Sequence, residues 1–369
     1  VYFTANHRRL LMSKVEKIVT STLITWHKAY GRHDLPWQVN EWYPRLVSEV
    51  MLQQTQVVTV LPKYQVFMSA FPTPTALAQA SDDEVMALWA GLGYYSRARN
   101  LLKTVRIIEE VFNGVCPRTA TELEKMPGLG PSTAGAIAAF AFQERAVMAD
   151  GNAQRVLSRL FLIKGHAGQS SYVKKIREKA LELLPTSSEM PEYTQALMDF
   201  GALLCTKKPK CELCPLSRVC QALQNGCVSE YPEKEPKKER PVRYASMVFV
   251  FTGEQVWLRK KIEKGVWHGL WVPPYEERNN ESEAIEVAPF LELLPEQIKR
   301  LFKLNPLIHD FTHYRLIIQA VVVDVNVKEA LADYSPIYVD KLNEVGLPTP
   351  VATLLEQGIA ARKIGPVVD

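Results

Sequence analysis

The sequence predicts a multidomain protein, with an all-α N-terminal region followed by an α+β C-terminal domain. From about residue 14 to residue 223, apolar residues recur at intervals of three and four, and Pro, Gly and Ser separate the segments, which is typical of amphipathic helices. The next stretch, SEYPEKEPKKERPVR, is rich in proline and charge and has the composition of a linker. We therefore expect a helical region at 14–228, a linker at 229–243 and an α+β domain at 244–365.

The α+β domain is predicted from a change of pattern after the linker. YASMVFVF (244–251), QVWLRKK (255–261) and RLIIQAVVVDV (315–325) are short β-branched or aromatic runs, typical of strands. Residues 282–302 and 350–360 have the longer apolar periodicity of helices. We expect these two helices to pack beside the strands.

Composition excludes several classes of protein. The hydrophobic fraction is 47% of 369 residues, which is ample for packed cores and argues against a largely disordered chain. No apolar run reaches the roughly 18–20 residues that span a bilayer, and the first residues lack the apolar core of a secretory signal. The net charge of +4 is compatible with nucleic acid as a partner but does not require it. We expect a soluble, intracellular protein that does not contact membranes.

A glycine-containing turn lies in KMPGLGPSTAGAIAAF (125–140). Gly128 and Gly130 permit positive φ and a close approach of the backbone to a ligand, and Pro131 suits the first turn of a following helix. The N-terminus of that helix adds about half a positive charge, which favours an anion. No lysine follows the glycines and both flanks are helical, so the turn is not a nucleotide P-loop. We interpret it as a helix–hairpin–helix that binds one DNA phosphate, rather than as an ordinary helix–helix turn.

Four of the six cysteines lie close together, separated by five, two and five residues: Cys205, Cys211, Cys214 and Cys220. Disulfide frameworks belong mostly to short secreted chains, so this cluster predicts a metal site. Four thiolates suit either Zn²⁺ or an iron–sulfur cluster, and the spacing leaves both open.

The motifs together resemble a known family. MPGLGPSTAG, ADGNAQRVLSRL and the cysteine cluster resemble the helix–hairpin–helix superfamily of DNA base-excision glycosylases, and SEVMLQQTQV and GLGYYSRARN narrow the resemblance to the MutY-type adenine DNA glycosylases. The resemblance covers nearly the whole chain. Superfamily members that cleave the strand through a Schiff base carry a lysine just after the hairpin, where this chain has Ser132. Because serine cannot form a Schiff base, we expect an enzyme that removes a base and leaves the strand intact.

Two carboxyl groups lie in contrasting surroundings. Glu49 is flanked by apolar residues in RLVSEVMLQQT, so burial should raise its pKa. Asp150 precedes an amphipathic helix, whose N-terminal N–H groups should favour its charged form. Taken alone, Asp150 is more typical of a plain N-cap. The resemblance implies that Glu49 protonates adenine, that Asp150 stabilises the sugar cation and that Asn152 helps to orient the reacting groups.

Other segments are expected to contact DNA. The resemblance implies that Leu92 and Tyr94 wedge into the base stack and that Gln54, beside Gln53, reaches into the vacated space. Taken alone, these residues are also typical of packing or of a polar helix face. Arg97 follows the aromatic pair and is expected to bind phosphate.

The resemblance implies that the four cysteines hold a [4Fe–4S] cluster rather than zinc. The loop between the first two cysteines carries Lys207, Lys208 and Lys210, for which we expect contacts with phosphates. The family usually has six residues between these two ligands, but this chain has five. The shortening puts the shape of the loop in doubt, not the assembly of the cluster.

The C-terminal domain resembles the Nudix-like module with which MutY proteins recognise 8-oxoguanine. The hydrolase signature of Nudix enzymes is absent between Gly265 and Gln297, so we do not expect nucleotide hydrolysis. Phe311, Thr312 and His313 match the family's Phe-Ser-His recognition loop, with Thr312 keeping the hydroxyl. Without the resemblance, His313 is an ordinary surface histidine.

We therefore predict a monomeric, cytoplasmic, bacterial enzyme that acts at the nucleoid and hydrolyses adenine from duplex DNA at 8-oxoguanine:A or G:A pairs. An endonuclease III-like glycosylase for oxidised pyrimidines is the alternative within the same class. A non-catalytic lesion-binding protein with a zinc or iron–sulfur site is the alternative from another class.

Overall fold

The computed structural model divides into two compact units, which we call the helical unit and the sheet unit. The helical unit comprises Val1–Ala78 and Lys103–Lys237, and the sheet unit comprises Gln79–Leu102 and Lys238–Asp369. The structure describes residues 14–236, 239–278, 287, 297–325, 331 and 333–364. The division differs from the boundaries expected from the sequence, because residues 79–102 group with the C-terminal residues.

Helices make up the chain up to the linker, as expected. They are α1 (Lys14–Tyr30), α2 (Trp42–Leu52), α3 (Val57–Ala70), α4 (Pro74–Gln79), α5 (Asp82–Leu88), α6 (Ser96–Val111), α7 (Ala120–Leu123), α8 (Pro131–Phe142), α9 (Gly151–Phe161), α10 (Ser170–Glu182), α11 (Met190–Asp199) and α12 (Gln221–Gln224), with a π-helical turn, η2 (Phe200–Leu204), after α11. No helix in these described stretches, or in the described residues after them, combines the length and apolar composition needed to cross a membrane.

Several helices begin at the residues that stereochemistry favours. At the start of α5, Ser81 and Glu84 form a capping box, and Thr119 and Glu122 form another at α7. Asp150 caps α9 by accepting a hydrogen bond from the backbone N–H of Ala153. These caps fix the ends of short helices whose own hydrogen bonds contribute little.

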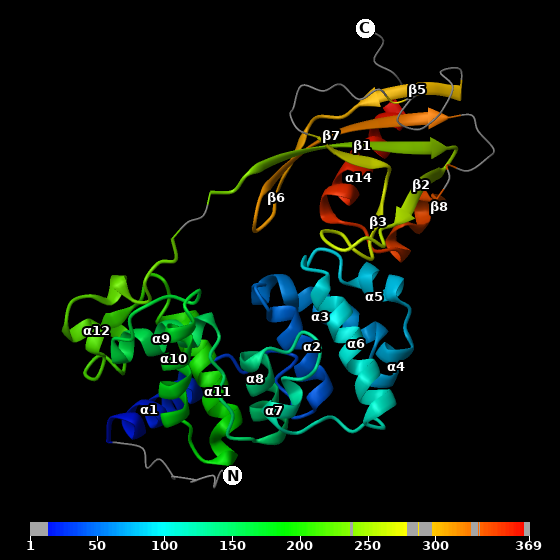
Figure 1. Cartoon of the computed structure of the whole chain (residues 1–369). Coiled ribbons are helices and arrows are strands. Elements are labelled where there is room, and N and C mark those ends of the chain that lie inside the picture. The colour runs from blue at the N-terminus through cyan, green and yellow to red at the C-terminus, as the bar shows by residue number, and fades with distance from the viewer. Residues whose placement is uncertain are drawn as a thin grey trace, which may run out of the picture. The chain divides into compact units, whose positions relative to one another are not determined.

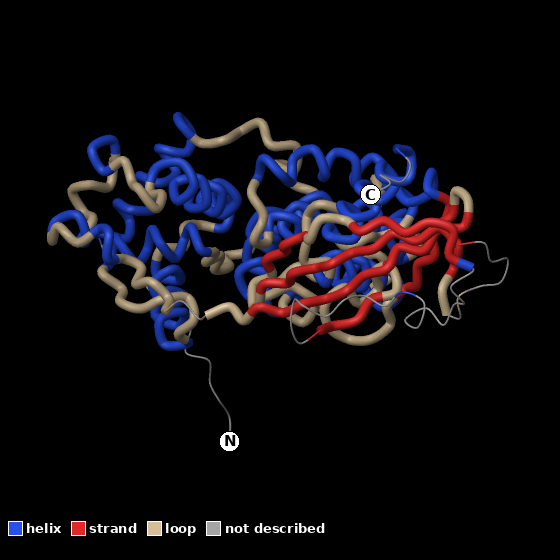
Figure 2. Tube along the Cα trace, turned by 90° about the horizontal axis from the view of Figure 1, so that it is seen from above, coloured by secondary structure: helices blue, strands red, loops and turns tan. Residues whose placement is uncertain are grey.

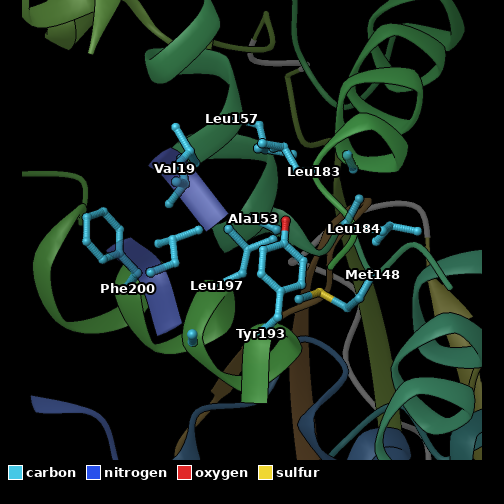
Figure 3. Close-up of a cluster of buried hydrophobic side chains, with 14 of the residues drawn as sticks. Val19, Met148, Ala153, Leu157, Leu183, Leu184, Tyr193, Leu197 and Phe200 are labelled. Carbon is cyan, nitrogen blue, oxygen red and sulfur yellow. The ribbon is translucent and has the colours of Figure 1, made fainter. Parts of the chain in front are cut away.

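One core of the helical unit lies among α1, α9, α10 and α11 (Figure 1). Figure 3 shows Val19 of α1, Leu157 of α9 and Leu197 of α11 in this core, with Phe200 of η2 beside them. The core anchors α9 from its first turn onward, and α9 begins directly after Asp150.

A partly buried ion pair joins the segment just after α1 to the end of α11. The Asp199 side chain is fully buried, and Arg32 donates hydrogen bonds to it from the backbone nitrogen and Nε, at 2.8 and 2.9 Å. Gln195 donates another at 3.0 Å, and His27 Nε2 lies 3.5 Å away. Burial raises the pKa of Asp199, but the hydrogen bonds from His27 and Arg32 outweigh it and bring the pKa down to about 2. Asp199 is therefore ionised at neutral pH.

Asp199→Ala should lower the free energy of unfolding of the helical unit by about 3 kcal/mol, because the partly buried Arg32 and the Gln195 amide lose a charged hydrogen-bond acceptor. Since the folded pKa, about 2, lies below that of an unfolded aspartate, this stabilisation is complete above about pH 4 and is lost as the pH falls through about 2. Denaturation followed by helical circular dichroism measures both effects. Glu178→Ala, which breaks an exposed pair with Lys174, should cost less than about 0.5 kcal/mol. An equal cost for both variants would contradict the prediction.

The described residues of the sheet unit form one mixed sheet of eight strands and a C-terminal helix, α14 (Thr349–Ile364). Figure 2 shows the strands gathered in a single layer. The strands are β1 (Val242–Thr252), β2 (Gln255–Lys260), β3 (Trp271–Val272), β4 (Tyr275–Arg278), β5 (Ile298–Lys303), β6 (Leu307–Asp310), β7 (Arg315–Val325) and β8 (Ser335–Tyr338). The backbone order is β3-β2-β1-β7-β5, and β4, β6 and β8 pair with β1, β7 and β2 respectively. The long central strands β1 and β7 run parallel, and the other pairs are antiparallel.

The two faces of the sheet are both apolar. Met247, Phe249 and Phe251 of β1 pack on the face that holds Val351 and Leu354 of α14. The alternate residues of β1 pack on the other face with residues of β7. Figure 1 shows α14 against the sheet, so the helix expected at 350–360 and the three expected strands are confirmed.

The prediction of a helix at 282–302 is wrong at the C-terminal end of that range. Residues 298–303 form β5, which pairs with β7, and its burial alternates residue by residue as in an edge strand. Pairing with β7 therefore overrides the helical pattern of IKRLF. Most of residues 282–296 lie outside the described residues.

Candidate active site

The predicted hairpin joins α7 to α8. Gly128 has φ 76°, which only glycine adopts without strain, and Gly130 caps α8 ahead of Pro131. Both glycines are exposed, and a Cβ added at Gly130 would meet nothing within 4 Å. Thr104 Oγ1 donates to the carbonyl of Pro127 at 3.0 Å. The hydrogen bond from Thr104 therefore holds the turn in place, while its two glycines remain accessible to a ligand.

The C-terminal end of α2 lies against this hairpin. Gln53 Nε2 donates to the carbonyl of Gly128 and to Thr133 Oγ1, each at 3.2 Å. Gln54 is exposed and has φ 57°. Gln53 thus supports the hairpin, whereas Gln54 is the glutamine that is available to a ligand.

Glu49 lies on α2 among buried apolar residues, including Leu46, Val50 and Met51. The side chain keeps partial exposure, so a substrate can reach it, although dense protein surrounds its carboxyl. Burial raises the pKa of Glu49 to about 7; the charge of Arg45 opposes this shift and the charge of Asp150 adds to it. Glu49 therefore holds its proton up to about neutral pH, as expected for a general acid.

Asp150 is fixed at the start of α9. Its Oδ1 accepts from the N–H of Ala153 at 2.7 Å, and its Oδ2 accepts from Asn152 Nδ2 at 3.4 Å. Burial raises the pKa of Asp150, while the hydrogen bonds from Ala153 and Asn152 lower it. The expected effect of the helix N-terminus is present, but burial outweighs it, which the sequence did not indicate. The charge of Asp150 in turn contributes to the raised pKa of Glu49.

The segment before Asp150 is held by α8. Ser132 Oγ accepts a hydrogen bond from the N–H of Ala149 at 3.1 Å. Gly135 faces the carbonyl of Val147, where a Cβ would lie only 2.1 Å from the oxygen. Ser132 therefore links the hairpin to the residue just before Asp150. Gly135 was not singled out from the sequence, because its role depends on a contact with a distant segment.

Asn152 is positioned from η2. A Cβ at Gly201 would approach the Cβ of Asn152 to 2.7 Å, so the π-helical turn packs directly on it. Arg155 Nη2 donates to Asn152 Oδ1 at 2.8 Å and to the carbonyl of Gly201 at 2.7 Å. Arg155 and Gly201 are positioning residues that sequence patterns alone did not reveal.

All four clustered cysteines line one cavity of the helical unit, together with Arg159. Burial and the neighbouring thiols raise the pKa of Cys211 and Cys220, and they raise that of Cys214 to about 11. The thiols are thus close enough to repel one another as thiolates, and a bound cation would relieve that repulsion.

The surroundings of these thiols are cationic. Arg159 is 3% exposed; its Nη1 lies 3.4 Å from Cys205 Sγ, and it forms no ion pair with a carboxylate of the described residues. Within the same residues, no three His, Cys, Asp or Glu side chains are arranged to hold a single metal ion. Lys207 and Lys208 are exposed on the loop after Cys205. The four thiols and the neighbouring guanidinium are suited to a metal group that is bound through thiolates.

In the sheet unit, the loop before α6 presents an aromatic side chain. Tyr94 is 49% exposed and has φ 45°, whereas Leu92 is 5% exposed. Tyr94 is therefore the exposed member of the predicted wedge. Its backbone conformation is unusual for a non-glycine residue, as is common at binding sites.

The structure corrects the expectation for Arg97. Its side chain is 7% exposed, and Nη2 donates to the carbonyls of Leu92 and Gly93 at 2.7 and 3.2 Å. The guanidinium also lies 5.6 Å from the ring centres of Trp89 and Tyr94. Arg97 braces the aromatic loop and is not available to phosphate.

The predicted recognition loop joins β6 to β7. Phe311 is held by the rings of Tyr314, at 4.7 Å, and His309, at 4.6 Å, while Thr312 and His313 are exposed. The hydroxyl groups of Thr312 and Tyr94 are hydrogen-bonded at 2.8 Å. Both loops line a cavity of about 560 Å³, which also includes His313. The structure thus brings these predicted residues together within the sheet unit.

Two protein-family models and several adenine DNA glycosylases match this chain. A family described as the HhH-GPD superfamily of base excision DNA repair proteins matches residues 47–185, and a NUDIX domain matches residues 246–357. An adenine DNA glycosylase of Buchnera aphidicola subsp. Baizongia pistaciae is 34% identical over 341 residues, which are 90% of this chain and 95% of that protein. The human adenine DNA glycosylase is 41% identical over 214 residues, 55% of this chain and 39% of that protein.

Among solved structures, a thermostable thymine-DNA glycosylase is 28% identical, with a TM-score of 0.51, and the match covers 57% of this chain and 98% of that one. The expected fold class is confirmed: a helical glycosylase domain is followed by a Nudix-like domain with a mixed sheet.

Proposed function

The chain belongs to the adenine DNA glycosylases of base excision repair, and on that premise we propose that it hydrolyses the N-glycosidic bond of adenine opposite 8-oxoguanine or guanine in duplex DNA. What supports this activity most directly is the pair of carboxyl groups, Glu49 and Asp150. Glu49 holds a proton near neutral pH, and Asp150 is seated among hydrogen-bond donors beside it. Such a pair supplies the acid and the anion that glycosidic cleavage requires.

The reaction divides between these two side chains. Glu49 donates its proton to the departing adenine, and the electron pair of the glycosidic C–N bond leaves with the base. The sugar becomes an oxocarbenium-like cation, which the Asp150 carboxylate stabilises. Water then adds its oxygen to the sugar carbon, and the proton that it releases returns to the Glu49 carboxylate and restores the acid. Asn152, hydrogen-bonded to Asp150, orients that carboxylate.

The base must leave the helix before this chemistry occurs. Tyr94 is suited to enter the base stack because it is exposed and held in place by Arg97. Gln54, exposed at the end of α2, is suited to fill the vacated space. The open glycines Gly128 and Gly130 bind one phosphate through backbone N–H groups. Thr312 and His313 read the base opposite adenine.

Strand cleavage is not part of the activity. Ser132 takes the place of the lysine that a Schiff-base mechanism requires, and its hydroxyl holds the Ala149 N–H. Its side chain thus serves the backbone before Asp150.

We assign a [4Fe–4S] cluster to Cys205, Cys211, Cys214 and Cys220. When bound, the cluster stabilises the loop that carries Lys207 and Lys208. Two observations support this assignment. Arg159 lies beside Cys205 and stabilises negative charge on thiolates. The four thiols line one cavity, and among the described residues they form no site for a single ion. Zinc is the alternative.

The purified protein should be brown, with broad visible absorbance, and Cys214→Ser should remove most of this colour. Iron and acid-labile sulfide analysis measures the same point. Cys116→Ser, at a buried cysteine outside the cluster, is the matched control and should keep the colour. A colourless protein that contains one zinc ion per chain would replace the iron–sulfur assignment with zinc.

End-labelled duplexes with a single 8-oxoguanine:A, G:A or 8-oxoguanine:C pair test the activity. We expect breaks at adenine in the first two duplexes and only after hot alkali, because the enzyme leaves an abasic site. Breaks without alkali would show a lyase nucleophile other than Ser132. Cleavage at oxidised pyrimidines would favour the endonuclease III-like activity, and tight binding without breaks would favour a lesion-binding protein.

A further inference from the structure

Arg45 is a buried cation on the same helix as Glu49. It lies four residues earlier on α2, so the two side chains occupy neighbouring positions one turn apart. Arg45 is 6% exposed, and its guanidinium lies 4.0 Å from the ring centre of Phe140. Its Nε donates to the carbonyl of Val39 at 2.8 Å. The position of the charge is thus fixed from two sides.

Part of this guanidinium has no partner. Nη1 is buried and has no hydrogen-bond acceptor within the part of the chain that the structure describes. Nor does Arg45 form an ion pair with any carboxylate of those residues. Burying a charged donor without an acceptor is costly, so an unpaired buried guanidinium calls for a function.

Glu49 is the carboxyl group on which this charge acts. The charged and titratable groups around Glu49 come from three elements: Arg45 on α2, Asp150 at the start of α9, and Tyr64 on α3, which faces Arg45. The fourth element, α8, packs on α2 and carries no titratable side chain. Burial and Asp150 both oppose ionisation of Glu49, and Arg45 favours it. Arg45 is therefore the group that makes the conjugate base of Glu49 tolerable.

We propose that Arg45 is a positioning residue for base excision, which stabilises the Glu49 carboxylate as that acid gives its proton to the departing base. This inference rests on the proposed role of Glu49 as general acid. When the O–H bond of Glu49 breaks and an N–H bond forms on adenine, a negative charge remains on a buried carboxyl group. The fixed guanidinium one turn away is already in place to offset that charge, so no reorganisation is needed at the moment of transfer.

Arg45→Met keeps the length and apolar packing of the side chain and removes its charge. Single-turnover excision from an 8-oxoguanine:A duplex, measured from about pH 5 to pH 9, should be up to about tenfold slower at low pH, because Glu49 becomes a weaker acid. The alkaline limb should move upward by about one pH unit, because Glu49 keeps its proton longer. The ratio of the wild-type rate to the variant rate should therefore fall as the pH rises. A purely structural defect would lower the rate by the same factor at every pH.

Two further variants complete the experiment. Arg45→Lys restores the positive charge and should return the alkaline limb of the pH–rate profile towards the wild-type position. Lysine lacks the guanidinium that donates to the carbonyl of Val39. Arg32→Met removes an arginine from the Asp199 network and should leave the limb where it is, whatever it does to stability. If the alkaline limb of Arg45→Met lies at the wild-type pH, the inference is overturned. The same holds if the alkaline limb of Arg32→Met shifts by as much as that of Arg45→Met.

Glu49→Gln, assayed on the same duplex, separates this inference from the proposed function. If Glu49→Gln keeps the activity and its alkaline limb, the general acid lies elsewhere and the proposed role of Glu49 fails. If Glu49→Gln is inactive while Arg45→Met keeps the wild-type limb, only the role of Arg45 fails.

Discussion

Glu49→Gln should reduce adenine excision by at least about 10³-fold while leaving duplex binding unchanged. Glutamine has the shape of the acid and fits the same apolar surroundings, but it has no proton to give to the leaving base. Single-turnover excision and gel-shift binding on an 8-oxoguanine:A duplex measure the two properties separately. Glu178→Gln, at an exposed position of α10, is the control and should behave as wild type.

Glu49 also sets the pH dependence of the excision rate. Glu49 must be protonated to act, and its pKa is about 7, so wild-type excision should fall about tenfold per pH unit above that value. Below about pH 7 Glu49 is protonated and its titration no longer changes the rate, so excision should fall again only at the lower pH where Asp150, whose pKa burial raises, takes up a proton. Activity that rises as the pH passes through about 7 would mean that Glu49 acts as a base in the rate-limiting step.

Local stereochemistry explains why much of this site was predictable from the sequence. The turn at Gly128, the helix start at Pro131 and the cap at Asp150 each depend on a few neighbouring residues. The cysteines also lie within one short stretch, so their convergence on one cavity follows from their spacing.

Features that depend on the folded path of the backbone were not predictable in this way. Arg97 follows a glycine turn, as a phosphate-binding arginine would, but the carbonyls of its own loop bind its donors. Residues 298–303 have a helical pattern, but β7 offers an edge and they pair with it. The edge of β7 is a tertiary partner, which a local pattern does not include. The partners of Arg97 are local, but they depend on the direction in which the loop turns its carbonyls.

Arg45 lies between these cases. Its place four residues before Glu49, in the apolar segment YPRLVSEV, is visible in the sequence and puts both on one helix face. Its burial and its unpaired Nη1 emerge only when Phe140 and Val39 are packed around it. The contacts of Gly135 and Gly201 were not predictable from the sequence, because they depend on the segments that pack against these glycines in the folded protein.

Asp150→Asn should lose at least about 10²-fold in excision while changing the free energy of unfolding by less than about 0.5 kcal/mol. Asparagine caps a helix as well as aspartate does, since its side-chain oxygen can accept from the Ala153 N–H in the same geometry. The substitution removes the negative charge that faces the sugar cation, together with the long hydrogen bond, 3.4 Å, that Oδ2 accepts from Asn152 Nδ2.

Asp150→Ala removes the charge and the cap together. It should lose excision to at least the same degree and also cost about 1 kcal/mol of stability, which denaturation by urea would measure. Comparing the two variants separates a catalytic aspartate from a structural one, because a residue that only caps α9 would make Asp150→Asn fully active and Asp150→Ala impaired through stability alone. A loss of excision in the asparagine variant, with α9 intact, means that the charge itself stabilises the transition state.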